Sequence, residues 1–537
     1  MSMFSKGLVN HKIFNMKKIN AILFAGLALM AVSCKKYLDV NTNPNSATST
    51  SPDLILPQAL VATAGNLNGF NSYGAQLGGY AANAGGYGGF GTSISYNFTS
   101  ADQSGRWSAT YDNLEDYQYI INSTKGQPVK SYFAGVAQIM RVIGFQLLVD
   151  AYNDVPYTEA LKGSDNLTPT YTDGKTIYKS LATELDSAIA KINVGNAFPG
   201  VTPLGSADVV FAGDMTKWKQ LANTIKLRLI VRGKASGVAF ANTTFSADGF
   251  LTTDALINPG YKRDNGRQNP KWNTWGYSYT GGNATTSWIA TRYILTFYNG
   301  TKVIDPIRGA ATYYQYPSVV ANRLGNEVSG SMPSCPPGGP WYPSTARVGA
   351  SAGNASGALK GPTVGYPLMT AAEAYFLRAE AAVVGITTEA AATMFTSGIV
   401  SAFNYTLTKE DGTLVTPVAA AITQYNNDNR TNPFVNFTLN TTTAQKVEAI
   451  ITQKYIAMNY VNSEEGWNEY RRTGYPTIVW GTNAASDITT FASVVSESTA
   501  PDRLPTRIVY PSAEGQYNGT NMPKGISPFT SKIFWAK

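Results

Sequence analysis

The stretch 368-LMTAAEAYFLRAEAAVVG-385 decides the fold of this chain. Its apolar residues recur every three or four positions, which is the spacing of one face of an α-helix. The stripe consists of Leu368, Met369, Ala372, Tyr375, Phe376, Ala379 and Val383. Gly385 follows as a C-cap, because glycine readily adopts the left-handed backbone that ends a helix. The stretch therefore predicts one amphipathic helix with a buried face.

The same spacing recurs along the chain and predicts further helices over 111–121, 132–149, 177–189, 218–229 and 447–458. These helices come in pairs and carry many small residues, as helical-repeat scaffolds do, although no strict 34-residue period is present. Polar, Gly-rich or Pro-rich stretches separate them over 65–106, 236–287, 308–366 and 480–531. Their aromatic content argues against disorder. We predict a mostly α body with long packed loops and little β, as one compact domain.

The start of the chain has the layout of an export signal. Basic Lys17 and Lys18 precede an apolar run over 21–32, which leads into Ala31-Val32-Ser33-Cys34. The run is too short to cross a bilayer as a helix, which needs about 20 apolar residues, and we expect no other segment to approach that length. Both Met1 and Met16 fit as the start of translation, since residues 1–15 add nothing to the signal.

A cysteine directly after small residues indicates a lipoprotein signal, in which Cys34 is acylated and becomes the new N-terminus. The alternative is an ordinary secretory signal that a cysteine happens to follow. One acyl chain holds a protein only marginally at a membrane, whereas two or more hold it firmly. We predict a signal peptide over 1–33, a lipidated tether over 34–52 and a ligand-binding domain over 53–537.

Composition excludes several kinds of chemistry. The one histidine, His11, lies in the predicted signal, so the mature chain has no Ser-His or Cys-His nucleophilic site and no zinc site that needs histidine. Cys34 and Cys335 are the two cysteines, and Cys335 has no histidine to activate it. The formal net charge of the chain is +8. Residues 1–33 contribute four of these positive charges, because they contain four lysines and no acid. The remaining charge is mild and shows no basic run, which argues against a nucleic-acid partner.

Several motifs, in order along the chain, resemble the SusD/RagB-type nutrient-binding lipoproteins, in the branch often called SusD-like. The resemblance is carried by CKKYLDVNTNPN over 34–45, DAYNDVPYTEA over 150–160, WKQLANTIKLRL over 218–229, DPIR over 305–308, LMTAAEAYFLRAE over 368–380, EGWNEYRRTGYP over 465–476, RLP over 503–505 and YP over 510–511. These motifs span nearly the whole mature chain in the family's order.

The resemblance implies a SusD-like fold with a tetratricopeptide-type helical scaffold, tethered to the outer face of a Bacteroidota outer membrane. It also implies a partner, a SusC-like TonB-dependent barrel that the lipoprotein covers as a lid. Glycans, or in some members peptides, are captured and passed into the barrel. Ligand contacts of the family follow no strict motif, so the resemblance transfers no ligand residue to this chain.

The stretch 271-KWNTWGYSY-279 is a candidate ligand site, because sugar rings need flat apolar platforms with polar partners for their hydroxyls. Its rings, Trp272, Trp275, Tyr277 and Tyr279, are spaced by two or three in a Gly/Ser/Thr context that favours a loop or an extended strand. Exposed rings of this kind mark binding surfaces. The alternative is that the rings bury the loop against the helices.

A second candidate site is the Gly-rich loop 78–91, followed by Tyr96 and Asn97. We expect it to place Tyr87, Phe90 and Tyr96 at a ligand or at the barrel, since glycines permit close approach and positive φ; a plain surface loop is the alternative. Gly86, Gly88 and Gly91 spell the dinucleotide fingerprint G-x-G-x-x-G. The pattern shows neither the buried strand before it nor the helix after it that nucleotide binding requires.

The sequence predicts a surface-tethered binding protein with no catalytic step, cofactor or metal, although scattered Asp and Asn oxygens leave calcium open. A lipid-anchored glycan hydrolase with paired carboxylates and a surface adhesin are the alternatives. Glu464, Glu465 and Glu469 lie near Arg471 and Arg472, where the helical pattern favours a structural ion-pair network. Trp107, Trp218, Trp467 and Trp535 flank helical stripes and are predicted to be core residues.

Overall fold

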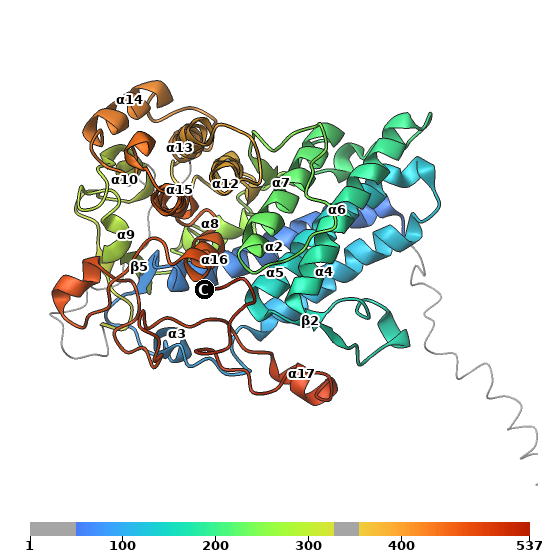
Figure 1. Cartoon of the computed structure of the whole chain (residues 1–537), viewed down its shortest axis with the longest axis horizontal. Helices are drawn as coiled ribbons and strands as arrows, with labels where there is room; N and C mark the ends of the chain where they lie inside the picture. The colour runs from blue at the N-terminus through green and yellow to red at the C-terminus, as the bar shows by residue number, and fades with distance from the viewer. Residues whose placement is uncertain (1–49, 327–353) are drawn as a thin grey trace, which may run out of the picture. The chain divides into compact units, whose positions relative to one another are not determined.

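The structure, a computed structural model, describes residues 50–326 and 354–537. Most of its regular structure is helical (Figure 1). The long helices are α2 (Pro52–Leu77), α4 (Ser104–Ser123), α5 (Ser131–Tyr152), α6 (Gly174–Ala197), α7 (Met215–Lys234), α12 (Ala371–Val383), α13 (Ala391–Leu407), α14 (Val418–Asp428), α15 (Thr443–Met458) and α16 (Ser463–Thr473). The shorter helices named below are α3 (Thr92–Ser95), α8 (Pro270–Trp275) and α17 (Ser512–Tyr517). A mostly helical body with little β is thus confirmed.

The described strands are short and form three small sheets. They are β1 (Ala81–Asn83), β2 (Val155–Pro156), β3 (Tyr171–Thr172), β4 (Ala255–Ile257), β5 (Trp288–Thr291), β6 (Ala321–Asn322) and β7 (Tyr366–Met369). One sheet has the order β1-β5-β6, with β1 antiparallel and β6 parallel to β5. The other two pair β2 with β3 and β4 with β7, both antiparallel. The sheets join loops to one another and to the helices rather than forming a layer.

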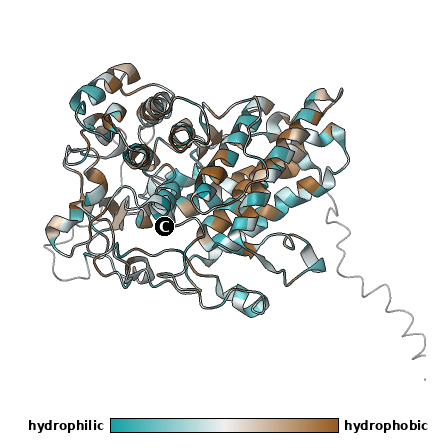
Figure 2. Cartoon of the chain, viewed as in Figure 1, coloured by the Kyte–Doolittle hydropathy of each residue, from teal (hydrophilic) through white to brown (hydrophobic). Residues whose placement is uncertain are grey.

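The helices pack as successive neighbours. Along the chain, α4 packs on α5, α5 on α6, α6 on α7, α12 on α13 and α15 on α16. Two further contacts connect distant parts of the sequence, since α7 packs on α12 and α16 packs on α2. Figure 2 shows hydrophobic and hydrophilic stretches on the same helices, as expected of helices with one buried face.

The stretch 368–385 begins as a strand and not as a helix. Leu368 and Met369 belong to β7, and the side chain of Thr370 caps α12 by accepting from the Glu373 N–H at 3.2 Å. Thr370 thereby stops the strand and starts the helix, so the apolar spacing ran across two elements. The predicted end is confirmed: Gly385 has φ 70°, and the amides of Gly385 and Ile386 bond back to the last turn of α12.

The other predicted helices lie within α4, α5, α6, α7 and α15. Two expectations about apolar segments and loops are wrong. Residues 65–77, assigned to a loop, belong to α2. We also expected no further segment of membrane-spanning length, but Pro128–Tyr152 is long and apolar enough by length and composition alone. Of its most apolar stretch, 78% is buried inside the body, as in a core helix.

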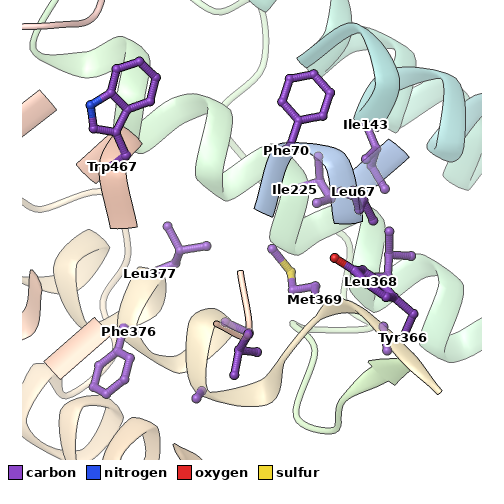
Figure 3. Packing of buried hydrophobic residues seen from close by; sticks show 14 of the residues in the cluster. Leu67, Phe70, Ile143, Ile225, Tyr366, Leu368, Met369, Phe376, Leu377 and Trp467 are labelled. Carbon is purple, nitrogen blue, oxygen red and sulfur yellow. The ribbon is translucent and has the colours of Figure 1, made fainter. Parts of the chain in front are cut away.

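One hydrophobic core runs through both halves of the described chain. Figure 3 shows Leu67 and Phe70 from α2 near Ile143 and Ile225, with β7 and α12 residues below them. The predicted core tryptophans Trp107, Trp218, Trp467 and Trp535 are all buried. Their burial is confirmed, and it anchors the adjoining helices and loops in the core.

Candidate functional site

The Gly-rich loop meets the chain beyond the first predicted ligand segment, which ends at residue 279. Asn83 of β1 pairs with Trp288 of β5, and the Ala84 N–H donates to the Ser287 carbonyl at 2.8 Å. This pairing continues past the strand ends. The hydroxyls of Tyr87 and Thr286 are 2.5 Å apart, so the Gly-rich loop lies along residues 286–288, the end of the segment 278–288.

An aromatic pair stands at this junction. The rings of Phe90 and Trp288 are 5.4 Å apart at an interplanar angle of 76°, an edge-to-face arrangement that such rings favour. Both side chains are half-buried, whereas Tyr87 is 40% exposed. We call Tyr87, Phe90 and Trp288 the aromatic surface. Trp288 was not among the residues selected from the sequence, although it closes the same tryptophan-rich stretch.

The rings expected to form the first ligand platform are mostly buried, and the expectation of an exposed loop or strand is wrong. Trp272, Trp275 and Tyr277 are each 2% exposed. Residues Pro270–Trp275 form α8, because Pro270 suits the first helical position and Asn269 caps it by accepting from the Lys271 and Trp272 amides.

Packing of these rings against the helices is the alternative that the structure bears out. Trp275 meets Tyr460 edge to face at 5.2 Å, and Trp272 contacts Tyr277 at 5.8 Å. Tyr279 differs from them, since it is 45% exposed. It sits at the tip of a hairpin in which the Ser278 N–H donates to the Gly282 carbonyl at 2.8 Å. Of the four predicted rings, Tyr279 alone is exposed.

In the second segment, Tyr96 is fully buried, so the expectation that it faces a ligand is wrong. Its hydroxyl accepts from the Ser493 N–H at 3.0 Å, and burial raises the pKa of that hydroxyl above its usual value. Asn97 is exposed, and its Nδ2 donates to Glu497 Oε2 at 2.8 Å. Both residues therefore hold the loop around residues 493–497 against α3.

The Gly-rich loop has no dinucleotide-binding geometry. The expectation that no strand precedes it and no helix follows it is wrong, because β1 and α3 flank it. However, β1 is antiparallel to β5, and α3 has four residues, so neither belongs to a parallel βαβ unit. A Cβ atom at Gly86, Gly88 or Gly91 would meet nothing within 4 Å. These glycines thus give the loop an open surface and not a close backbone contact.

Polar contacts join the sheet that carries Trp288 to neighbouring loops. Arg323, directly after β6, donates to the carbonyls of Ala492 and Gly481 at 2.8 Å each. Its guanidinium also lies 4.8 Å from the ring centre of Trp480. The Thr291 hydroxyl donates to the Gly79 carbonyl at 2.5 Å, which joins β5 to the turn before β1. These contacts fix β5 and β6 to the turn before β1 and to the loops around residues 481 and 492.

The paired carboxylates of α16 form a buried ion network and no open catalytic pair. Lys454 Nζ lies 2.9 Å from Glu469 Oε1, and Arg232 pairs with Glu465. Burial alone would raise the pKa of Glu469, but Arg472 and Lys454 lower that pKa to about 2. The network also joins Asp150, Arg228, Glu373 and Glu380. The predicted structural ion-pair network is confirmed for Glu465, Glu469 and Arg472, whereas Glu464 and Arg471 form no ion pair within 4.0 Å in the part of the chain that the structure describes.

No three histidine, cysteine, aspartate or glutamate side chains are placed to hold a metal ion within residues 50–326 and 354–537. Cys34 and Cys335 fall outside these ranges, so the predictions of a lipidated Cys34 and an inert Cys335 lie outside the described residues.

Comparison with known families matches both halves of the chain. Residues 44–265 match a SusD-like family described as starch-binding and associating with the outer membrane. Residues 352–532 match a second SusD-like family, described as SusD and RagB outer membrane lipoprotein. A search among curated proteins finds no match. The two family matches define the class of protein, a lipoprotein of the outer membrane. The chain belongs to the SusD/RagB-like family.

Solved structures share the fold at low sequence identity. A SusD homolog from Bacteroides fragilis superposes with a TM-score of 0.63 at 20% identity, covering 91% of this chain and 100% of its own. A chitin-binding SusD homolog from Flavobacterium johnsoniae gives 0.64 at 21%, covering 89% and 98%. An outer membrane protein from Bacteroides vulgatus gives 0.66 at 19%, covering 91% and 100%. The SusD-like fold is therefore shown.

Proposed function

We propose that the protein, an outer-membrane nutrient-binding lipoprotein by its family, captures a glycan on the aromatic surface. The observation that carries this proposal is an aromatic patch on two segments that have no charged side chain of their own. Neither the loop 84–91 nor the segment 278–288 contains a lysine, arginine, aspartate or glutamate. Ring faces offer flat apolar contacts for the C–H faces of a sugar, and the hydroxyls and amides of segment 278–288 offer hydrogen bonds to its hydroxyl groups.

The neutral surface favours a glycan over a peptide. A free peptide carries charged termini, and leaving a charged group desolvated without a partner is costly. A neutral oligosaccharide has no such requirement. Peptide binding is the second candidate, and the experiment below tells the two apart.

Delivery to a transporter completes the proposal. SusD-like families are associated with SusC-type transporters in general. The protein would act as a lid on a SusC-like TonB-dependent barrel, tethered through lipid at Cys34, and would catalyse no reaction itself. The burial of the α16 carboxylates supports binding without hydrolysis, since 2–5% exposure leaves them no access to a glycosidic bond.

The test is calorimetric titration with chitohexaose, maltohexaose and a hexapeptide. Trp288→Ala and Phe90→Ala should each weaken binding of at least one sugar by about tenfold, which corresponds to ~1.4 kcal/mol. Tyr517→Ala is the matched control, because Tyr517 is an aromatic residue 77% exposed on α17. Unchanged sugar affinity in both variants would refute the site. Binding of the hexapeptide but of neither sugar would show that the ligand is a peptide and not a glycan.

Two further measurements address the alternatives. Co-purification of a TonB-dependent barrel with the tagged protein from its native host would support the lid over a free-standing adhesin. Incubation with the bound sugar for hours should release no new reducing ends, whereas their appearance would establish the hydrolase.

A further inference from the structure

A cleft of about 500 Å³ lies between β4, the loop before β7 and the end of α13. Small-ligand clefts have volumes of about 300–1,000 Å³, so this one is large enough for a ligand. Its polar and aromatic lining includes Asp254, Asn258, Lys360, Asn404 and Tyr405. None of these residues belongs to the aromatic surface. In Figure 1, α13 lies at the upper left, well apart from β5 and α3.

Lys360 is a nearly buried amine on the wall of this cleft. Its Nζ donates to the carbonyl of Tyr405 and, at 2.6 Å, to the carbonyl of Thr408 at the end of α13. It lies 4.3 Å from the ring centre of Tyr405. An ammonium group has three donors, so two bonds to fixed carbonyls orient it and leave one N–H for a ligand.

Asp254 supplies an acceptor from another element. Its Oδ1 accepts from the Ala371 N–H at 2.8 Å, at the first turn of α12. Among the described residues, no hydrogen bond reaches Oδ2, and Asp254 forms no ion pair with Lys360 within 4.0 Å. The carboxylate and the ammonium are thus both held by backbone groups and do not neutralise each other by direct contact.

Amide groups complete the set of ligand partners. Asn404 is exposed, and within the described ranges its side chain makes no hydrogen bond. Asn258 uses its Oδ1 to accept from the Gly260 N–H at 3.0 Å, which leaves its NH₂ group open. The two acids of the lining, Asp254 and Glu410, are balanced by two lysines. This balance favours a neutral ligand over an anion.

We propose that this cleft is a second carbohydrate-binding site, which takes one or two sugar units of a neutral glycan. Asp254 accepts from sugar hydroxyls, Lys360 and the two asparagines donate to them, and Tyr405 lines the wall. The ligand class rests on the proposed function, but the site is independent of the aromatic surface. It would let the protein hold a polymer at two points, which raises avidity by effective concentration.

The test uses a parent variant in which the aromatic surface is removed by Tyr87→Ala, Phe90→Ala and Trp288→Ala. Chitohexaose and maltohexaose are titrated into this parent and into the parent carrying Asn404→Trp, which fills the cleft from an exposed position. Thr396→Ala, at an exposed position elsewhere on α13, is the matched control. Circular dichroism verifies that each variant is folded. Hydrogen–deuterium exchange of the parent, with and without sugar, reports the bound segments.

The parent should retain binding to at least one sugar, with slower exchange over 360–365 and 404–412. Asn404→Trp should weaken this residual binding at least tenfold, and Thr396→Ala should leave it unchanged. A parent that binds neither sugar, or an Asn404→Trp variant that binds as the parent does, would overturn the second site. These outcomes are separate from those of the proposed function, which depend on the loss of affinity from the wild type to the single-ring variants.

Discussion

A Cβ atom at Gly74 would lie 2.3 Å from the backbone nitrogen of Glu464, so α2 and α16 touch backbone to backbone. The contact is reinforced at the next turn, where Asn71 Oδ1 accepts from the Ser463 N–H at 2.8 Å and satisfies the first amide of α16. A residue near the start of the described chain therefore sets the position of a helix near its end.

Gly74→Ala should destabilise the protein, because backbone atoms cannot move aside as a flexible side chain can. We expect the free energy of unfolding to fall by about 1–3 kcal/mol, measured by guanidinium denaturation. Gly65→Ala is the control on the same helix, since a Cβ there would meet nothing within 4 Å. That variant should gain about 0.5–1 kcal/mol. Equal stability of the two variants would contradict the close contact.

Arg232→Met should be costly because it leaves the buried carboxylates of Asp150 and Glu465 without their guanidinium partner. Breaking a buried pair typically costs about 3–5 kcal/mol. Lys217→Met, also on α7, removes a pair with Asp214 at 3.9 Å that is largely exposed, and should cost at most about 1 kcal/mol. If both variants lose a similar free energy of unfolding, the buried ion network is not the reason that Arg232→Met is destabilised.

Glu464 should make stability depend on pH. Burial raises the pKa of its carboxyl to about 7, and its Oε2 has no hydrogen-bond partner in the described structure. An acid whose pKa is raised on folding contributes stability below its unfolded value, and that contribution is lost as the pH rises through the folded pKa. Between about pH 4.5 and 7, this residue should therefore weaken the fold by up to about 3 kcal/mol.

Glu464→Gln removes this titration. Denaturation midpoints of wild type and variant should be compared at pH 5 and pH 8, where the variant should gain relative to wild type at the higher pH. If the midpoints of wild type and variant differ by the same amount at both pH values, Glu464 is not the group that makes stability depend on pH.

Trp272→Ala should lower stability by about 3–5 kcal/mol, since it removes a large buried side chain from the core. Tyr279→Ala, at the exposed hairpin tip, should change stability by less than about 0.5 kcal/mol. Thermal denaturation of both variants distinguishes a core role from a surface role. A Trp272→Ala variant as stable as Tyr279→Ala would return Trp272 to the candidate ligand residues.

Cys34→Ser should abolish lipid modification. Mass spectrometry of wild-type protein from the native host should find acyl chains on residue 34, and the variant should leave the membrane fraction. An unmodified wild-type Cys34 would favour the ordinary secretory signal.

The long apolar helices could be predicted from sequence because their burial leaves a 3.6-residue pattern, as in α5 and α7. The pattern failed where glycines interrupt it: α2 carries Gly65, Gly69 and Gly74, of which Gly74 is required by α16 and not by α2 itself. Spacing also could not show that Thr370 divides the stretch 368–385 into a strand and a helix.

The candidate site was predictable only in part, because the exposure of a ring is decided by tertiary contacts. The local composition around Trp272 and Trp288 is similar, yet Trp272 faces the core while Trp288 meets Phe90, 198 residues away in sequence. The Gly-rich loop was found because its glycines and rings leave a compositional signal. The cleft at Lys360 left none, since its residues come from three separated segments.

The ion pairs between α7 and α16 join the two different regions matched by the family comparisons. A gene cut between those regions would encode two polypeptides, each with interior charges whose partners lie in the other. Neither region can therefore complete its buried ion pairs without the other.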